Sequence, residues 1–261
     1  MLAAERYEMI VRLVNERGSM RVSELSELCG VTEETIRRDL DKLEEAGRLR
    51  RSHGGAVSVQ EQHTEIPYTE RELTRPKEKK MIALEAVKRI RPRDRILLDA
   101  SSTAWYLASV LPDMPLTVLT NSIKVSLELA AKPQIEVVCT GGLLLSRSLS
   151  YVGPLAEQAL DQYYVNRAFI SCKGIHLERG ISESNELQAR LKQKMIGIAN
   201  EVVLLADSSK LDVQDFAQVA GLERVHTLIT DAQADPAYLK ELESRFGMQT
   251  VTANSSKNEE K

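Results

Sequence analysis

Short apolar runs that recur beyond residue 90 constrain the fold of this chain more than any other feature. They cover residues 96–99, 116–120, 135–139, 168–172, 202–206 and 227–230. Helical patterns lie between most of them, at 105–111, 123–131, 154–160, 186–199 and 236–246, and another at 77–90 precedes them. Strands that are apolar throughout and separated by helices form a mostly parallel sheet with helices on both faces. The sequence therefore predicts an α/β domain.

The first 57 residues follow a different pattern. Apolar residues recur at helical spacing up to Gly18, a short second helix ends at Gly30, and a third helix begins at the N-cap residue Thr32. This third helix carries an apolar stripe at i, i+4 and i+7, made of Ile36, Leu40 and Leu43. The arginine-rich ribbon that follows turns at Gly54 and Gly55, which supply the positive φ of a hairpin turn. Three helices and a β-ribbon predict a winged helix-turn-helix.

The arginines of this unit gather on the third helix and on the ribbon. The second helix of a helix-turn-helix enters the major groove of DNA, where a guanidinium group binds guanine or phosphate in a bidentate manner. The net charge of −3 excludes a generally basic surface but not a local basic patch. The predicted contacts to double-stranded operator DNA are Thr32, Thr35, Arg37, Arg38, Arg48, Arg50 and Arg51.

Two other interpretations of the arginines remain open. Glu33 and Arg37, like Glu34 and Arg38, are four residues apart, and such pairs stabilise an exposed helix by ~0.2–0.5 kcal/mol each. The winged unit can also be a protein-interaction domain. Substitution of both arginines distinguishes these interpretations, because only a DNA-binding role predicts a change in operator affinity and its salt dependence.

The chain divides into four segments. The predicted bounds are 1–57 for the winged unit, 58–76 for a linker, 77–252 for a sensor domain and 253–261 for a disordered tail. Cys29, Cys139 and Cys172 have no metal-ligand spacing, so no metal site is expected, and their odd number argues against a disulfide framework. No signal peptide and no membrane-spanning run is found, which favours a reducing, cytoplasmic setting.

Polar motifs follow the predicted strands of the sensor domain. In an open α/β sheet, ligands bind at the carboxyl ends of the strands, and free backbone N–H groups at a helix N-terminus bind anions. The candidate effector-binding residues are Asp99, Ser101, Ser102, Thr103, Thr120, Asn121, Ser122, Gly141, Gly142, Lys173, Gly174, Glu183, Asp207 and Lys210. Taken singly, the hydroxyl residues can be plain N-caps and the glycines plain turns. Their convergence at strand ends favours a phosphorylated ligand.

The chain resembles the DeoR family of bacterial transcriptional regulators over nearly its whole length. The resemblance rests on TEETIRRDLDKLEEAGRLRRSHGGAV, LLDASST, VLTNS, TGG, SLSYVGPLAE, KGI and LLADSSK. It implies an N-terminal winged helix-turn-helix and a C-terminal sensor domain similar in fold to ribose-5-phosphate isomerase. In the family the positions that match the strand-end motifs line a pocket for a phosphorylated sugar. Most members repress sugar-catabolic operons and release DNA when the effector binds.

An isomerase with an accessory winged domain is the alternative from another functional class. Sugar-phosphate isomerisation needs a general base beside the reacting carbons and an acid that polarises the carbonyl. The related enzymes carry acidic residues after the strand that here ends in Thr140, Gly141 and Gly142, whereas this sequence continues with three leucines. No catalytic residue and no cofactor is therefore predicted.

Two further expectations concern the effector and the assembly. The stretches DASSTAWYLASVLP and FISCKGIHLERGISESNELQARLK resemble a subgroup associated with rhamnose catabolism, which implies rhamnulose 1-phosphate as effector. A generic hexose or pentose phosphate is the alternative. A single winged domain offers too few base contacts for operator-level discrimination, so a homo-oligomer is expected.

Overall fold

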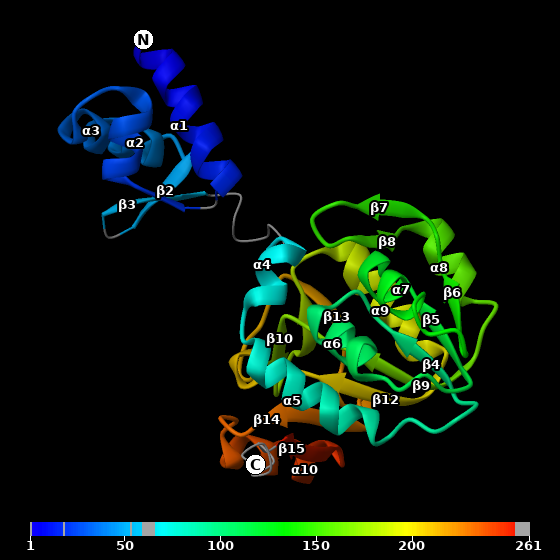
Figure 1. Cartoon of the computed structure of the whole chain (residues 1–261). Coiled ribbons are helices and arrows are strands. Elements are labelled where there is room, and N and C mark those ends of the chain that lie inside the picture. The colour runs from blue at the N-terminus through cyan, green and yellow to red at the C-terminus, as the bar shows by residue number, and fades with distance from the viewer. Residues whose placement is uncertain (1, 18, 53, 59–65, 254–261) are drawn as a thin grey trace, which may run out of the picture. The chain divides into compact units, whose positions relative to one another are not determined.

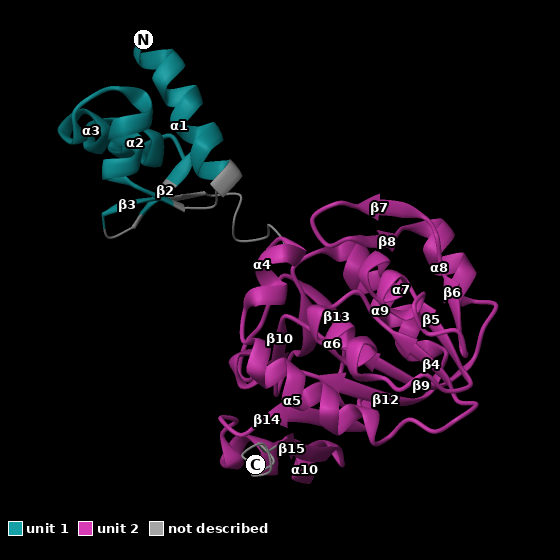
Figure 2. Cartoon of the chain, in the orientation of Figure 1, with its two compact units in different colours: residues 1–64 teal, residues 65–261 magenta. Residues whose placement is uncertain are grey.

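The computed structural model describes residues 2–17, 19–52, 54–58 and 66–253. The chain divides into two compact units, Met1–Thr64 and Glu65–Lys261 (Figure 2). Within the described residues, no helix combines the length and the apolar character needed to cross a membrane. The two units are considered separately.

The first unit is a winged helix-turn-helix, as the sequence predicts (Figure 1). Its elements are α1 (Ala3–Arg17), β1 (Ser19–Arg21), α2 (Val22–Cys29), α3 (Glu33–Glu45), β2 (Leu49–Ser52) and β3 (Gly55–Ser58). The strands form an antiparallel sheet in the order β1-β3-β2. Gly55 allows this sheet to close, because a Cβ atom at that position would lie 2.1 Å from the carbonyl oxygen of Met20.

The core of this unit is built on the stripe predicted for α3. Ile36, Leu40 and Leu43 are fully or almost fully buried against the apolar faces of α1 and α2. The hydroxyl of Thr32 accepts a hydrogen bond from the backbone N–H of Thr35 and so caps the helix, as expected. Burial of one helix face leaves the opposite face of α3 exposed to a partner.

The second unit is built around a parallel sheet of seven strands in the order β15-β14-β12-β9-β4-β5-β6 (Figure 1). These strands are β4 (Arg95–Leu98), β5 (Leu116–Thr120), β6 (Ile135–Cys139), β9 (Val165–Ile170), β12 (Ala199–Leu205), β14 (Thr227–Asp231) and β15 (Gln249–Ala253). Every neighbouring pair in this sheet is parallel. The predicted α/β class is confirmed.

Helices cover both faces of this sheet. The helices are α4 (Tyr68–Leu73), α5 (Pro76–Val87), α6 (Ser102–Val110), α7 (Ile123–Leu129), α8 (Pro154–Leu160), α9 (Glu186–Gly197) and α10 (Pro236–Phe246). Buried residues of α5, α6 and α7 form one apolar core with one face of the strands, and those of α8, α9 and α10 form a second core with the other face. Alternate residues of β4 enter the two cores, so the sheet separates them.

The chain order reverses between β4 and β9. From β4 the chain proceeds to β5 and β6 at one edge, and it then returns to β9 on the other side of β4. Ligands of open α/β sheets bind at such a point, outside the carboxyl ends of the two diverging strands. The segments that follow β4, β9 and β12 therefore define where a ligand site is expected.

Two small antiparallel sheets are added to this framework. One contains β10 (Gly174–His176), β11 (Gly180–Glu183) and β13 (Ala217–Ala220), and the other is a hairpin of β7 (Leu143–Leu145) and β8 (Ser150–Val152). These strands of three or four residues carry too little periodic signal for sequence-based prediction. They matter for function because Glu183 lies at the end of β11.

The segment predicted as a linker, 58–76, differs in the structure. From residue 66 onward the chain belongs to the second unit, where Tyr68 of α4 is 1% exposed. Burial of the aromatic ring of Tyr68 explains why residues 66–76 pack with the second unit although most of them are polar. The predicted tail included residue 253, but Ala253 is a buried residue of β15. Residues 254–261 of the predicted tail lie outside the described residues.

Candidate functional site

The exposed face of α3 carries the predicted groove-facing arginines. The side chains of Arg37 and Arg38 are 48% and 74% exposed, and they pair with Glu33 at 2.6 Å and with Glu34 at 3.2 Å. Each pair joins residues one helical turn apart, and exposed pairs of this kind contribute only a few tenths of a kcal/mol. The two guanidinium groups can therefore exchange their glutamates for phosphate or base atoms at little cost.

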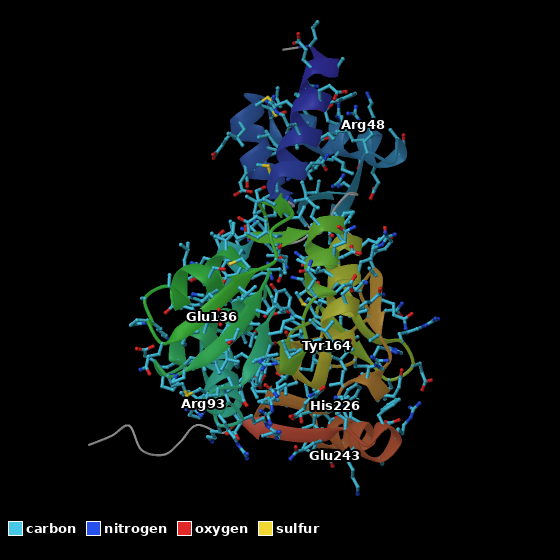
Figure 3. The ribbon with its side chains drawn as sticks, turned by 90° about the vertical axis from the view of Figure 1, so that its right-hand side faces the viewer. Arg48, Arg93, Glu136, Tyr164, His226 and Glu243 are labelled. Carbon is cyan, nitrogen blue, oxygen red and sulfur yellow. The ribbon has the colours of Figure 1, made fainter. Side chains whose placement is uncertain are left out.

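The arginines of the ribbon are held differently. Arg48 forms two hydrogen bonds of 2.8 and 2.9 Å with the carboxylate of Glu8 on α1 (Figure 3). Arg51 donates to the carboxylate of Asp41 and to the carbonyl oxygen of Arg37, so it lies against α3. The side chain of Arg50 lies outside the described residues. The structure thus places two ribbon arginines toward helices of their own unit rather than freely outward.

A buried ion pair fixes α3 to α1. The Nε of Arg6 lies 2.5 Å from the carboxylate of Asp39, and these side chains are 13% and 5% exposed. Hydrogen bonding to Asp39 raises the pKa of Arg6 although burial opposes the charge. Because Asp39 is on α3, this pair orients the exposed face of that helix. The sequence prediction did not include it.

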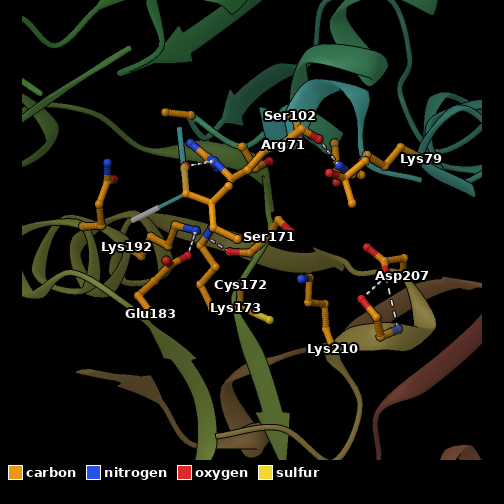
Figure 4. Close-up of a pocket in the computed structure, with 17 residues that line it drawn as sticks. Arg71, Lys79, Ser102, Ser171, Cys172, Lys173, Glu183, Lys192, Asp207 and Lys210 are labelled. Carbon is orange, nitrogen blue, oxygen red and sulfur yellow. Dashed lines mark hydrogen bonds and ion pairs between the residues drawn. The ribbon is translucent and has the colours of Figure 1, made fainter. Parts of the chain in front are cut away.

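A cavity of about 110 Å³ lies at the reversal point of the second unit (Figure 4). Seven predicted effector residues line it: Ser101, Ser102, Thr103, Lys173, Glu183, Asp207 and Lys210. They come from the segments after β4, β9 and β12 and from the end of β11. The parallel register of these strands explains why residues more than a hundred positions apart meet here.

A buried lysine between two carboxylates forms one end of the cavity. The Nζ of Lys192 lies 3.0 Å from Asp99 and 2.5 Å from Glu183, and all three side chains are at most 7% exposed. Burial opposes the ammonium charge, but the two carboxylates outweigh it and raise the pKa of Lys192. Asp99 also accepts the backbone N–H groups of Ser101 and Ser171, so it joins the loops after β4 and β9.

Cationic side chains gather at the other end of the cavity, around Asp207. Burial lowers the pKa of Lys79 to about 8; the nearby Asp207 opposes this shift, and Lys210, Arg71 and Lys173 add to it by repulsion. Figure 4 shows Asp207 and Lys79 on the side of the cavity opposite the Lys192–Glu183 pair. The cavity wall thus carries Arg71, Lys79, Lys173 and Lys210 but only one carboxylate, Asp207, besides the Lys192–Glu183 pair. This excess of positive charge favours an anionic ligand.

The N-terminus of α6 adds to this positive end. Ser101 caps the helix by accepting from the backbone N–H of Ala104, and Ser102 and Thr103 lie in its first turn at the cavity wall. The first N–H groups of a helix and its dipole attract anions. The thiol of Cys172, also at the wall, remains protonated because burial raises its pKa to about 12.

Seven predicted effector residues are not among those that line the cavity: Asp99, which lies behind the wall and pairs with Lys192, and Thr120, Asn121, Ser122, Gly141, Gly142 and Gly174. Ser122 caps α7, and Thr120 accepts the backbone N–H of Ser122. Gly142 has a φ of +114°, and a Cβ atom there would lie 2.8 Å from the carbonyl oxygen of Val152. A Cβ atom at Gly174 would lie 2.3 Å from the carbonyl oxygen of Val213. These contacts give the motifs roles in chain packing.

Several cavity residues were missed by the sequence prediction: Arg71, Thr74, Lys79, Ser171, Gln188 and Lys192. Lys79 precedes the buried Ile82 and Ala83 of α5, and Lys192 precedes the buried Met195 and Ile196 of α9 by the same spacing. A lysine on the buried stripe of a helix requires an anionic partner or ligand. That signal, applied to the helices as well as to the strand ends, identifies both lysines.

Metal ligation has no evident basis here. Within the ranges that the structure describes, no group of three or more histidine, cysteine, aspartate or glutamate side chains is arranged to hold a metal ion. The cavity offers lysine ammonium groups, hydroxyls and two buried carboxylates that are already paired with Lys192. This set suits a ligand that carries both a negative charge and hydroxyl groups.

Comparison with known proteins gives consistent matches over both units. The family model described as the DeoR C terminal sensor domain matches residues 74–232, and the DeoR-like helix-turn-helix domain matches residues 6–62. The uncharacterized HTH-type transcriptional regulator YulB of Bacillus subtilis is 55% identical, over 94% of this chain and 95% of that protein. The L-fucose operon activator of Haemophilus influenzae is 39% identical, over 87% of this chain and 91% of that protein.

Among solved structures, ribose 5-phosphate isomerase A from Methanocaldococcus jannaschii matches with a TM-score of 0.38 and 21% identity. The match covers 51% of this chain and 53% of that chain. Similarity at this level supports no functional conclusion. The sequence relatives are transcriptional regulators, so the isomerase alternative is not favoured.

Proposed function

Because the chain belongs to the DeoR family of transcriptional regulators, we propose that it controls a sugar-catabolic operon in response to a phosphorylated sugar. The observation that carries this proposal is the gathering of Lys79, Lys173 and Lys210 beside the N-terminus of α6 in one cavity. The rhamnose subgroup remains a prediction from the sequence resemblance, and rhamnulose 1-phosphate is our first candidate effector.

The phosphate group of the effector binds at the cationic end of the cavity. The hydroxyls of Ser102 and Thr103 and the first N–H groups of α6 donate hydrogen bonds to it, and the lysine ammonium groups neutralise its charge. A phosphate monoester carries about −1.5 to −2 charges at neutral pH. The mutual repulsion of the lysines in the empty cavity is relieved when such a group binds.

The sugar portion extends toward the opposite end, where Glu183 and Gln188 offer oxygen acceptors and Lys192 holds the Glu183 carboxylate in place. Gln188 donates to the hydroxyls of Ser148 and Ser150, which fixes its amide and leaves its carbonyl oxygen for a ligand hydroxyl. Recognition of hydroxyl groups by fixed polar side chains gives strong discrimination between sugars. A relative named as an L-fucose operon activator supports a sugar rather than another phosphorylated ligand.

The first unit binds operator DNA through the exposed face of α3. Thr32, Thr35, Arg37 and Arg38 lie in the first two turns of this helix, the part that reaches base edges in helix-turn-helix complexes. The chain acts as a homo-oligomer, because paired half-sites supply the discrimination that one winged unit lacks. The family resemblance favours repression that the effector relieves. The effect of the effector on operator affinity decides whether it releases the protein from DNA or strengthens its binding.

A thermal-shift panel tests the sensor function. Rhamnulose 1-phosphate, fructose 1-phosphate, ribose 5-phosphate, unphosphorylated rhamnose and inorganic phosphate are compared on the full-length chain. An effector at ~100 times its dissociation constant stabilises the unit by roughly 2.7 kcal/mol. Lys210→Ala is expected to abolish that stabilisation, and Lys240→Ala, an exposed lysine on α10, serves as its control. If no sugar phosphate stabilises the protein, the proposed effector class is wrong.

A further inference from the structure

Helix α4 contributes directly to the wall of the effector cavity. The cavity is lined by Arg71 of α4 and by Thr74, the residue directly after this helix. The ammonium of Lys79, at the start of α5, donates a hydrogen bond to the carbonyl oxygen of Arg71. A phosphate bound at Lys79 attracts the same ammonium group that donates to that carbonyl oxygen. Occupation of the cavity therefore changes a contact that holds the C-terminal end of α4.

The junction between α4 and α5 is tied to the same end of the cavity. Arg75 has a φ of +50°, in the left-handed region that residues other than glycine seldom adopt. Its guanidinium group donates to the hydroxyl of Ser208 at 3.1 Å and lies 3.7 Å from the carboxylate of Asp207. Asp207 lines the cavity, so the strained residue next to α4 is held by a group that faces the ligand.

The side of α4 away from the cavity is held by a separate set of contacts, which we call the α4 latch: Tyr68, Glu72, Tyr106 and Lys124. The carboxylate of Glu72 lies 3.2 Å from the ammonium of Lys124, and the backbone carbonyl of Glu72 accepts from the hydroxyl of Tyr106 at 3.2 Å. The same ammonium lies 5.6 Å from the centre of the Tyr68 ring, within the range of a cation–π contact. The latch thus joins α4 to α6 and α7.

Tyr68 gives α4 a buried polar group that lacks a partner within the part of the chain that the structure describes. Its ring is 1% exposed, and its hydroxyl has no hydrogen-bond partner among the described residues. Burial, reinforced by the carboxylate of Glu72, raises the pKa of this hydroxyl, so it stays protonated. An unsatisfied buried hydroxyl costs about 1–3 kcal/mol, which a small displacement of the helix can recover.

The position of α4 in the chain gives these contacts a consequence. Along the sequence, α4 is the helix of the second unit nearest to the winged unit, whose last described strand ends at Ser58. Among the helices of the sensor, α4 is therefore the first along the chain whose displacement would reach the segment that leads to the DNA-binding residues. Coupling between two sites requires an element whose arrangement both sites bias, and α4 meets this requirement on the sensor side.

We propose that α4 transmits effector occupancy to the winged unit and that the latch residues Glu72, Tyr106 and Lys124 are positioning residues for this coupling. The inference rests on the proposed function, since it concerns regulation by the same cavity. Effector binding draws Lys79 and Arg71 toward the phosphate, and the latch converts that pull into a displacement of the whole helix. Without the latch, the helix end adjusts locally and the displacement is lost.

Three measurements on the full-length chain separate coupling from binding. The first is the affinity for rhamnulose 1-phosphate, or for fructose 1-phosphate if only that ligand stabilises the protein. The second is the affinity for a DNA duplex selected by the wild-type chain from a random pool, and the third is the same affinity with the ligand at saturation. The ratio of the two DNA affinities is the coupling, which is typically 5–150-fold in allosteric proteins.

Lys124→Met and Tyr106→Phe remove the latch contacts without touching the cavity or α3. We expect both variants to keep each binary affinity within about twofold of wild type and to reduce the coupling ratio toward one. Lys194→Met is the matched control, because it removes an exposed ion pair with Asp161 in the same unit. Tyr106→Phe deletes a single hydroxyl, so it tests the inference even if Lys124→Met does not fold.

The outcomes distinguish the inference from the function on which it rests. If wild type binds no sugar phosphate, or its operator affinity ignores the ligand, the proposed function fails and the inference fails with it. If wild type is coupled and both latch variants are equally coupled, the inference alone is overturned. Lost coupling together with lost ligand affinity would also overturn it, because the latch would then belong to the binding site.

Discussion

The cationic side chains of α3 and those of the effector cavity are held in different environments. Arg37 and Arg38 are 48% and 74% exposed, and each faces a glutamate one turn away. Lys192 is 7% exposed and lies between two buried carboxylates. Exposed pairs contribute about 0–1 kcal/mol and are weakened by salt, whereas removal of one member of a buried set leaves an uncompensated charge. The first arrangement suits groups that change partners on DNA, and the second suits a fixed frame around a ligand.

The largest effect is expected for Lys192→Met. This change leaves Asp99 and Glu183 buried without their cation and should destabilise the second unit by about 3–5 kcal/mol. Lys194→Met on the same helix removes an exposed pair and should cost at most ~1 kcal/mol. Trp105, the single tryptophan, reports unfolding of the second unit by fluorescence in denaturant. Equal losses of stability in Lys192→Met and Lys194→Met would contradict the expected difference between buried and exposed ion pairs.

A smaller loss is expected for Arg6→Met in the winged unit. The loss should be about 3 kcal/mol, at the lower end of the range for broken buried pairs, because Arg6 retains 13% exposure. Circular dichroism should show the helices of the first unit melting earlier while the Trp105 fluorescence transition stays in place. Arg38→Met is the control on the exposed face. The contrast would be weakened if the control lowered the melting temperature as much as Arg6→Met.

The pH dependence of effector binding probes the cationic end of the cavity. Since the pKa of Lys79 is lowered to about 8, its ammonium deprotonates as the pH rises from 7 to 9. If phosphate binding requires that charge, affinity falls about tenfold over this range, while the phosphate itself stays dianionic. Calorimetry of wild type and Lys79→Arg measures this, and the arginine variant should show a flat profile.

The sign for stability is opposite to the sign for affinity. The folded pKa of Lys79, about 8, lies below its ordinary value of 10.5, so the unfolded chain binds the proton more tightly between these values. The contribution of Lys79 to the free energy of unfolding therefore rises with pH from about 8 to 10.5. An affinity and a stability that fell together in this window would show that Lys79 does not act as proposed.

The smallest effect on stability is expected for Arg37→Ala and Arg38→Ala. Each should change the free energy of unfolding by no more than about 0.5 kcal/mol, because only an exposed pair is lost. Each should nevertheless weaken DNA binding and reduce the slope of log affinity against log salt by about 1 if the arginine contacts phosphate. If the double variant keeps the DNA affinity and the salt slope of wild type, α3 is not part of the DNA-binding surface.

The fold was predictable because its signals are local and repeated. The apolar runs at 116–120 and 135–139 have the same bounds as strands β5 and β6. The helical patterns at 154–160 and 236–246 have the same bounds as helices α8 and α10. The strand β15 was missed because its sequence, QTVTA, has few apolar residues. Helix α4 was missed because its six residues, YTEREL, are mostly polar and show no apolar stripe at helical spacing.

The candidate site was predictable where strand ends supply it. Ser101, Lys173 and Asp207 follow three strands whose parallel pairing brings their carboxyl ends together. Lys79 and Lys192 reach the cavity from helices, so strand-end motifs cannot reveal them. Thr120 ends β5 and Asn121 follows it, one strand away from the reversal point. This lateral distance explains their absence from the cavity wall.

The reversal of chain order between β4 and β9 has a kinetic consequence. The residues proposed to bind the phosphate come from both sides of this reversal point, with α6 on one side and Lys173 and Lys210 on the other. A bound effector therefore bridges two halves of the sheet that are contributed by separate stretches of chain. Separation of these halves during unfolding must first break the bridge, so the lifetime of the folded sensor is expected to lengthen in inverse proportion to the unoccupied fraction of the cavity.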